Sequence, residues 1–188
     1  YTENDFALAE DVEAKAVRTE VGTTNMELTE DSFVNKSDNF TNVKFEVTDG
    51  YIEVKPAEGA IVVTIVGNND TVTYDGEEHT VTGYTVTEIS NELYKETDFT
   101  FSGTAEAKGT AAGFYPMELT AENFTNNNPN FSNVEFEIKD GGLTITPITD
   151  EVVVTITGNN DSKFYTGQPH TVEGYTFSIN NDLYTEND

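Results

Sequence analysis

Two histidines, His79 and His170, are the only imidazole groups in the chain and the first residues to consider for catalysis or metal binding. They lie 91 positions apart at one place in a repeated pattern, and no second histidine is near either of them in sequence. Hydrolytic catalysis needs several convergent groups, including a positioned nucleophile. We therefore interpret both as strand residues with a hydrogen-bonded ring nitrogen. The sequence predicts no catalytic residues, no cofactor and no enzymatic activity.

Carboxylates and amides gather in two turn-like segments, and their oxygen atoms are ligands that calcium prefers. The first segment is Asn68-Asn69-Asp70, followed by Asp75, and residues 159–161 repeat the Asn-Asn-Asp triplet without the later aspartate. The EF-hand spacing is absent from both. Asn and Asp also favour turns through local hydrogen bonds, which explains the same residues without a metal. Calcium binding stays open as an alternative, and we assign no metal ligands.

A glutamate and a lysine two positions apart recur as Glu13 and Lys15 and as Glu106 and Lys108. Residues with this spacing share one face of a strand. The pair lies at the end of an expected strand, before a loop, so we interpret it as an exposed ion pair. Such pairs contribute about 0–1 kcal/mol to stability.

Tyrosines at several repeat positions could stack against sugar rings. They are Tyr74, Tyr84, Tyr94, Tyr115 and their repeats. Several alternate with apolar neighbours, which is typical of half-buried packing residues in strands. Carbohydrate binding therefore stays an alternative that exposed aromatic side chains on one face would favour.

These candidates recur because the chain repeats itself with a period of 91 residues. Phe131, Phe136 and Pro147 restate Phe40, Phe45 and Pro56, and Gly158 and Tyr165 restate Gly67 and Tyr74. A period of this length indicates an array of like domains, each long enough to enclose its own core. The opening phrase, residues 1–5, also returns as the closing phrase, residues 184–188. This return favours a segment cut from a longer array.

Within the repeat, apolar and polar residues alternate with a period of two, which indicates half-buried strands. Strands are expected near residues 62–66, 71–74, 79–89, 99–101, 115–119, 134–139 and 143–145. We expect a bend at Gly83, a turn at residues 67–70, and hairpin turns at Asp49-Gly50 and Asp140-Gly141, with glycine at positive φ. Single helical turns are expected near residues 29–33 and 120–124. The pattern predicts an all-β fold of tandem antiparallel β-sandwiches that form an elongated rod.

The composition excludes several classes of partner. The chain has 35 acidic and 9 basic residues and a formal charge of −26, so it lacks the basic stripe that binding to nucleic acid requires. The same charge disfavours attachment to an anionic membrane. The chain has no cysteine, which excludes disulfides and thiolate metal sites. No apolar run approaches the roughly 20 residues of a membrane span, so we predict no membrane insertion in this segment.

Pro56 and Pro147 each end an expected strand, because proline cannot donate a hydrogen bond to a strand ladder. Boundaries placed there define residues 1–58 as the C-terminal portion of a repeat, 59–149 as a complete β-sandwich repeat, and 150–188 as the N-terminal portion of the next. The alternative cut gives 1–93 and 94–188 as two permuted units. The four-residue connectors predict restricted motion between repeats. Strand addition between the tail of one molecule and the head of another is a further hypothesis, so end-to-end self-association is possible.

Three phrases resemble the MBG-type repeats of bacterial surface proteins: residues 74–84, residues 112–117 and residues 130–147. That family consists of Ig-like β-domains in tandem within large extracellular adhesins, often from Gram-positive gut bacteria. The resemblance implies an extracellular, cell-wall-anchored parent protein on a bacterial surface, and it implies no catalytic residues. The first copy departs from the pattern at Val17-Arg18, which lie in a longer loop, and at Thr24-Asn25-Met26 in place of Tyr115-Pro116-Met117.

The function that these observations predict is structural. The chain would be a spacer or stalk repeat of a bacterial surface adhesin, with neighbouring repeats of the same chain as its contacts. The alternative is a carbohydrate- or host-protein-binding module of the same surface protein, which would use its loops or aromatic faces to bind a host glycan or protein.

Overall fold

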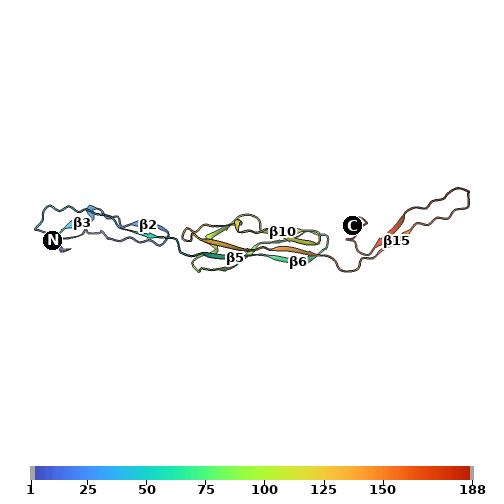
Figure 1. Ribbon diagram of the computed structural model, residues 1–188, viewed down its shortest axis with the longest axis horizontal. Helices are drawn as coiled ribbons and strands as arrows, with labels where there is room; N and C mark the ends of the chain where they lie inside the picture. The colour runs from blue at the N-terminus through green and yellow to red at the C-terminus, as the bar shows by residue number, and fades with distance from the viewer. Residues whose placement is uncertain (1–2, 187–188) are drawn as a thin grey trace. The chain divides into compact units, whose positions relative to one another are not determined.

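The computed structural model describes residues 3–186, and in this range strands and short 3₁₀ turns make up the regular secondary structure without any α-helix (Figure 1). The strands are β1 (Phe6–Leu8), β2 (Gly22–Asn25), β3 (Phe33–Asn35), β4 (Tyr51–Val54), β5 (Ile61–Gly67), β6 (Asn69–Thr73), β7 (His79–Thr82), β8 (Tyr84–Ile89), β9 (Phe99–Phe101), β10 (Glu106–Gly109), β11 (Gly113–Pro116), β12 (Phe124–Asn126), β13 (Val134–Lys139), β14 (Gly142–Thr146), β15 (Val154–Gly158) and β16 (Tyr175–Ile179). The all-β prediction is confirmed.

The 3₁₀ turns are η1 (Glu3–Asp5), η2 (Glu30–Ser32), η3 (Glu96–Asp98) and η4 (Ala121–Asn123). The two helical turns expected from the sequence are therefore confirmed as η2 and η4. Part of the repeated opening and closing phrase, residues 1–2 and 187–188, lies outside the described residues.

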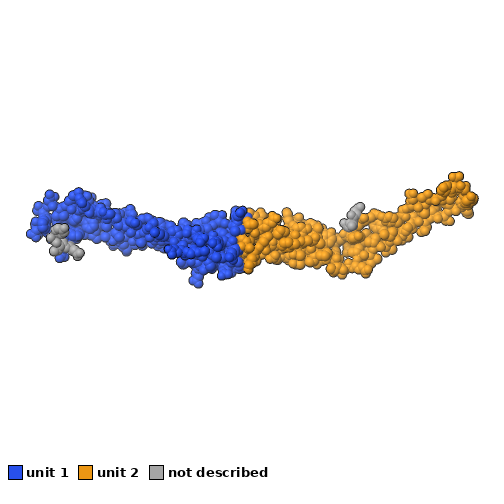
Figure 2. All heavy atoms as spheres, viewed as in Figure 1, with its two compact units in different colours: residues 1–64, 86–102, 121–137 blue, residues 65–85, 103–120, 138–188 orange. Residues whose placement is uncertain are grey.

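Contacts divide the chain into two compact units, coloured blue and orange in Figure 2. Unit 1 comprises residues 1–64, 86–102 and 121–137, and unit 2 comprises residues 65–85, 103–120 and 138–188. Strands β5, β8 and β13 contribute residues to both units, because the division points fall inside them. The repeat boundaries at residues 58 and 149 follow a different criterion, the period of the sequence, and they stay a prediction.

Unit 2 contains the three-stranded sheet β11-β14-β6 and the two-stranded sheet β10-β7. Strands β10 and β7 lie against β14. The buried apolar side chains of unit 2 are Ile65, Ala107, Met117, Leu119, Leu143 and Ile145. Most pairings are antiparallel, as expected for a β-sandwich, but β14 runs parallel to β6, with Leu143 opposite Asp70 and Ile145 opposite Val72.

Unit 1 contains the sheet β13-β5-β8 and the pairs β12-β9, β1-β3 and β2-β4. Its core is largely aromatic: Phe99 and Phe124 both contact Phe136, and the ring of Tyr94 meets that of Phe131 edge to face at 5.3 Å. Along β5, every second residue is buried and the intervening residues are half-buried. This alternation is the burial that the apolar run near residues 62–66 predicts for a strand inside a sandwich.

From β5 to β14, each strand belongs to a different sheet from the strand that follows it in sequence, and this corrects two expectations. The turn expected at residues 67–70 is wrong, because only Asn68 separates β5 from β6 and the two strands belong to different sheets. The hairpins expected at Asp49-Gly50 and Asp140-Gly141 are also wrong. Neither glycine has a positive φ angle, and β13 and β14 lie in different sheets. The bend expected at Gly83 is confirmed: its φ is 87°, and it links β7 and β8, which join separate sheets.

The backbones at Gly67 and Gly141 lie so close together that neither position has room for a side chain. A β-carbon on Gly67 would lie 2.4 Å from the nitrogen of Gly141, and one on Gly141 would lie 2.3 Å from the carbonyl oxygen of Asn68. Glycine is required here for close backbone approach and not for its torsion angles. Gly158 occupies the same repeat position as Gly67, and a β-carbon there would meet no atom within 4 Å.

In an incomplete copy, strands form only where that copy contains counterparts of both strands of a pair seen in the complete copy. The pairs β1-β3, β2-β4 and β15-β16 restate β9-β12, β11-β14 and the neighbours β5-β8. Residues 43–48 restate β13, which pairs with β5, and residues 160–164 restate β6, which pairs with β14. Both segments lie in irregular structure, since no described residues restate β5 before the first or β14 after the second. A strand needs a neighbour to satisfy its backbone groups, so alternation alone does not produce one.

Candidate functional site

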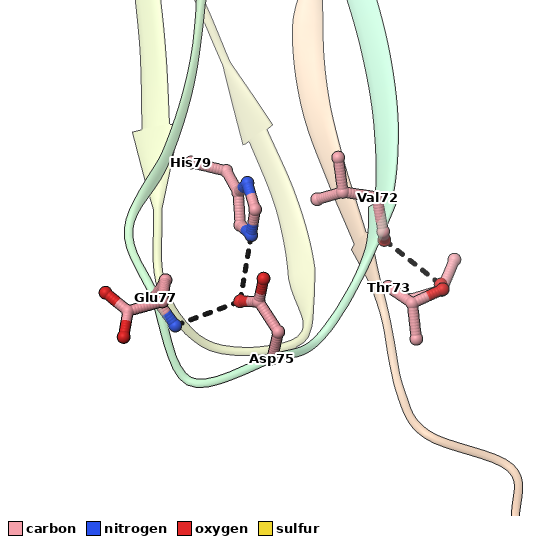
Figure 3. Close-up of polar contacts among 6 residues, drawn as sticks. Val72, Thr73, Asp75, Glu77 and His79 are labelled. Atoms are coloured by element: carbon pink, nitrogen blue, oxygen red, sulfur yellow. Dashed lines mark hydrogen bonds and ion pairs between the residues drawn. The ribbon is translucent and has the colours of Figure 1, made fainter.

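His79 begins β7, and its imidazole faces Asp75 across the turn after β6 (Figure 3). The Nε2 of His79 lies 2.9 Å from Asp75 Oδ1, and the same oxygen accepts a hydrogen bond of 2.9 Å from the N–H of Glu77. These two contacts, the Glu77 N–H first and the imidazole second, hold the pKa of Asp75 below its ordinary value. The sequence pattern suggests Asp75 only as a possible calcium ligand and does not reveal this pair.

The second histidine repeats the arrangement with a different partner. His170 Nε2 lies 3.0 Å from Thr166 Oγ1, and Thr166 occupies the repeat position of Asp75. A carboxylate can orient an imidazole for hydrolysis, but the reaction also needs a nucleophile and donors for an oxyanion. Because a hydroxyl replaces the carboxylate while the contact is kept, the shared role of both pairs is to close a five-residue segment, residues 75–79 and 166–170. The expected hydrogen bond to a ring nitrogen agrees with this geometry for both histidines. His79 lies in a strand as expected, but the strand expected at His170 is wrong: His170 lies in irregular structure, because no described residues supply a counterpart of β10 to pair with it.

In the first candidate calcium segment, the amide nitrogens of the asparagine side chains donate hydrogen bonds to backbone carbonyls. Asn68 Nδ2 donates to the carbonyl of Thr82 at 2.8 Å, and Asn69 Nδ2 donates to the carbonyl of Gly67 at 3.1 Å. Asn159 and Asn160 make the corresponding contacts, with the carbonyls of Glu173 and Gly158. Across residues 3–186, no three His, Cys, Asp or Glu side chains group closely enough to hold a metal ion. Asn68 and Asn159 thus join their strand ends to the bend at Gly83 or Gly174.

Glu106 and Lys108 lie on β10 with 3.9 Å between Oε1 and Nζ, and both side chains are partly or largely exposed. The structure therefore agrees with an exposed ion pair. Glu13 and Lys15 lie in irregular structure between β1 and β2, because the strand that would pair with this segment, the counterpart of β7, does not precede it among the described residues.

The tyrosines differ in exposure between copies in a way that follows strand pairing. Tyr94 is 1% exposed in the complete copy, whereas its repeat Tyr184 is 43% exposed. Tyr74 is half-buried, whereas its repeat Tyr165 is 95% exposed in the unpaired segment after β15. The exposure of these side chains therefore follows from neighbouring strands that no described residues of this copy supply, whereas the complete copy buries Tyr94 and half-buries Tyr74.

Asp140 makes a contact that sequence analysis missed. Its carboxylate accepts hydrogen bonds of 3.0 Å from the N–H groups of both Glu118 and Leu119, and one of 2.9 Å from Gly141. Glu118 has a φ of 60°, a left-handed conformation that is unfavourable for a residue with a side chain. The carboxylate therefore fixes the strained segment that brings Met117 and Leu119 into the core.

The first copy repeats this contact, because Asp49 accepts hydrogen bonds from the N–H groups of Glu27 and Leu28, and Glu27 has a φ of 62°. The signal in the sequence was the aspartate 22 positions after a glutamate in both copies. The aspartate is also the first residue of an Asp-Gly dipeptide, and because that dipeptide is a strong local hairpin signal, it predicts a turn instead.

Replacement of Asp140 by alanine is expected to lower the free energy of unfolding of the complete copy by about 2–3 kcal/mol, because several N–H groups lose a charged acceptor. The matched control is Asp49→Ala, which removes the same contact from the two-stranded β2-β4 region. Chemical denaturation followed by circular dichroism should show a clear shift of the main transition for Asp140→Ala and little for Asp49→Ala. Equal shifts would contradict the role assigned to Asp140.

Asn130 joins the complete copy to the preceding one within unit 1. Its Oδ1 accepts a 2.8 Å hydrogen bond from the N–H of Val21, and its Nδ2 donates to the carboxylate of Glu20. Its own carbonyl accepts from the N–H of Ala57 at 2.8 Å, and Ala57 forms a parallel bridge with Phe131. The contacts come from the loop between β1 and β2 and from the connector after Pro56.

Arg18 organises the loop that Asn130 contacts. Its guanidinium donates to the carbonyls of Glu20 and Val21, at 2.8 and 2.6 Å, and to that of Thr23 at 3.3 Å. The loop in the first copy is two residues longer than its counterpart in the complete copy. The departure at Val17-Arg18 noted in the sequence thus supplies the arginine that shapes the junction.

These features define a class of protein: a β-sandwich repeat whose polar side chains close turns and join successive copies. Within this class, the family model of the MBG domain matches residues 61–147, and the chain therefore contains an MBG domain. The resemblance drawn from the sequence phrases is confirmed, and MBG domains occur in surface, adhesin-like repeat proteins. No curated protein and no solved structure matched the chain. Among the described residues, no helix has the length and apolar character that crossing a membrane requires.

Proposed function

We propose that this chain is a structural spacer, a stalk segment that holds another part of a bacterial surface adhesin away from the cell. The observation that carries the proposal is the junction at Asn130, where one side chain and the adjoining backbone connect the loop, the connector and the complete copy. A spacer must keep its two ends apart, which requires that successive repeats move little relative to one another. Contacts of this kind restrict that motion. An extracellular location on a cell-wall-anchored parent protein belongs to the same proposal.

The charge of the chain supports this role. At −26, copies of the chain repel one another in solution, which keeps an extended surface soluble. The side chains considered for catalysis or metal binding, those of His79, Asp75 and Asn68, make local contacts that close turns. We therefore propose a mechanical role without catalysis, with neighbouring repeats as the principal partners.

The test is whether the first copy and the complete copy move together. In ¹⁵N relaxation measurements on the full chain, the amides of β2 and β4 and those of β5 should report one rotational correlation time. Asn130→Ala should let the two groups separate, because the loss of its hydrogen bonds costs about 1 kcal/mol for each contact. Asn127→Ala, which removes only a contact with Thr100, is the matched control and should change nothing. Independent motion in the unaltered chain would contradict the proposal.

The alternative, a module that binds a host glycan or protein, depends on exposed aromatic side chains. The tyrosine exposures argue against a dedicated sugar platform, because the complete copy packs Tyr94 inside the sandwich. A glycan array or mucin pull-down with the full chain distinguishes the two functions. Saturable binding to one glycan would favour the module, and no binding is the result that a spacer predicts.

A further inference from the structure

The strands through which the chain enters and leaves the complete copy are neighbours. The chain enters through β5 and β6, which only Asn68 separates, and leaves through β13 and β14. β6 and β14 run parallel over five residue pairs. A hydrogen bond closes each end of this ladder: the N–H of Gly142 donates to the carbonyl of Asn68 at 3.1 Å, and the N–H of Tyr74 donates to the carbonyl of Thr146 at 2.8 Å.

β5 and β13, which are neighbours in the other sheet, also run in one direction. At the start of both strands, the N–H of Ile61 donates to the carbonyl of Asn133 at 2.9 Å. At their other end, the backbone of Gly67 lies against that of Gly141. Strands that begin together and end together are parallel. The entering segment, residues 61–73, and the leaving segment, residues 134–146, therefore run side by side in the same direction (Figure 1).

This arrangement decides how the complete copy meets tension along the chain. Tension pulls the entering segment toward its N-terminal end and the leaving segment toward its C-terminal end. Two parallel strands loaded in this way must slide past each other, so the hydrogen bonds between them share the load and break together. Strands that are pulled apart from the end they share open one bond at a time, which requires less force.

We propose that the parallel pair β6-β14 is a mechanical clamp, by which the complete copy resists tension along the chain. The proposal deepens the spacer function and rests on it for the direction of the load. β14 is the middle strand of its sheet, and its residues Leu143 and Ile145 are 0% and 2% exposed. Sliding of β14 would therefore also draw buried apolar side chains out of the core.

The close approach of Gly67 and Gly141 adds a steric stop to the clamp. A slide of two residues keeps each side chain on its own face of the strand, and in the direction of the tension it would bring Asn69 to the place of Gly67. A β-carbon at that place would lie 2.4 Å from the nitrogen of Gly141, so a side chain does not fit. The two segments thus cannot shift register in small steps, and the ladder must break as a whole.

Thr146 ties the two strands together at the end where the tension leaves the copy. Its hydroxyl donates to the carbonyl of Val72 at 3.1 Å, and Oγ1 lies 3.3 Å from Oγ1 of Thr73. Thr144 lies two residues earlier on the same face of β14, opposite Thr71. The two threonines therefore offer a matched pair of positions, of which only Thr146 bridges β14 and β6 through its side chain.

Force spectroscopy on single molecules of the full chain tests the clamp, with handles on introduced cysteines because the chain has none of its own. Glu58→Cys with Thr149→Cys pulls along the path of the chain, and Glu77→Cys with Thr149→Cys pulls both strands from the end they share. All three positions are exposed and lie outside the ladder. At one loading rate, we expect the first geometry to need at least about twice the rupture force of the second, because the residue pairs share the load.

The two threonine positions test the contribution of the side chain. Thr146→Val keeps the branched shape and removes the hydroxyl, so it should lower the rupture force in the first geometry. Thr144→Val is the matched control and should leave that force unchanged, with circular dichroism to verify the fold of both variants. Equal rupture forces in the two geometries, or equal losses in the two threonine variants, would overturn the clamp. The relaxation measurement at Asn130 tests the spacer function separately, because repeats can move together without resisting tension.

Discussion

Gly67→Ala is expected to destabilise the complete copy more than any other single change considered for this chain. The new β-carbon would lie 2.4 Å from the nitrogen and 2.8 Å from the α-carbon of Gly141, and 3.1 Å from a methyl carbon of Leu119. Two of these three atoms belong to the backbone, which cannot rotate away as a side chain can. Overpacking in a sandwich core costs about 1–3 kcal/mol and more where the backbone must shift, so we expect a loss of about 3 kcal/mol or more.

Gly158→Ala is the matched control, because Gly158 has the same repeat position and no atom within 4 Å of an added β-carbon. We expect its free energy of unfolding to change by less than about 0.5 kcal/mol. For a domain of this size, the loss at Gly67 corresponds to a fall in melting temperature of about 12 °C or more, which calorimetry at low protein concentration measures directly. Similar melting temperatures for the two variants would show that the close approach of Gly67 and Gly141 does not hold the sandwich together.

Tyr94 is expected to make the stability of the complete copy depend on pH in the alkaline range. Burial first, and the negative charge of Asp98 second, raise the pKa of Tyr94 to about 12. The single proton of the phenol has two acceptors within reach, the side-chain oxygen of Asn126 at 3.0 Å and the carbonyl of Asp98 at 3.3 Å from the hydroxyl oxygen. All three effects favour the protonated form in the folded state.

The sign of the pH effect follows from this shift. The unfolded chain releases the tyrosine proton near pH 10, and the folded chain keeps it until about pH 12. The stabilisation is therefore complete below pH 10 and is lost as the pH rises through the pKa of the folded state, at up to about 1.4 kcal/mol for each pH unit. Urea denaturation between pH 8 and pH 12 should show the fall.

Tyr94→Phe separates this effect from the titration of the other tyrosines. At neutral pH it should cost about 1 kcal/mol for the lost hydrogen bonds, because the ring still packs against Phe131. Above pH 10 its stability should decline less steeply than that of the unaltered chain. Parallel declines for the two proteins would contradict a buried, protonated Tyr94.

Local patterns in the sequence predicted the features that depend on neighbouring residues. The alternation in residues 134–139 became a strand with alternating burial, and Gly83 became the bend between β7 and β8. The helical turn near Thr120 also formed, as η4. In each case the residues that decide the conformation lie within one short segment.

The predictions that were wrong concern features that depend on pairing between segments distant in sequence. Residues 43–48 alternate as residues 134–139 do, but they form no strand because no counterpart of β5 lies beside them. Asp140-Gly141 has the composition of a hairpin turn, but its two flanking strands join different sheets. The dipeptide signal is the same in either case, and only the positions of β6 and β11 beside β14 decide the outcome.

The polar contacts were missed for the same reason. Glu118 and Asp140 lie 22 positions apart, and Val21 and Asn130 lie 109 apart, so neither pair has a signature in a local window. The repeat itself could have pointed to the first pair, because Glu27 and Asp49 keep the same spacing. The contact of Asn130 occurs once among the described residues, and periodicity could not have revealed it.

Hydrogen exchange of the backbone amides in the full chain tests most directly whether one complete sandwich is flanked by two incomplete copies. The amides of β5, β13 and β14 should exchange slowly and together, because opening them requires unfolding of the complete copy. Residues 43–48 and 160–164 should exchange as fast as an unfolded chain, at a concentration where the molecule is monomeric. Uniform protection along the whole chain, or faster exchange in β5 and β14 than in the flanking segments, would contradict the account.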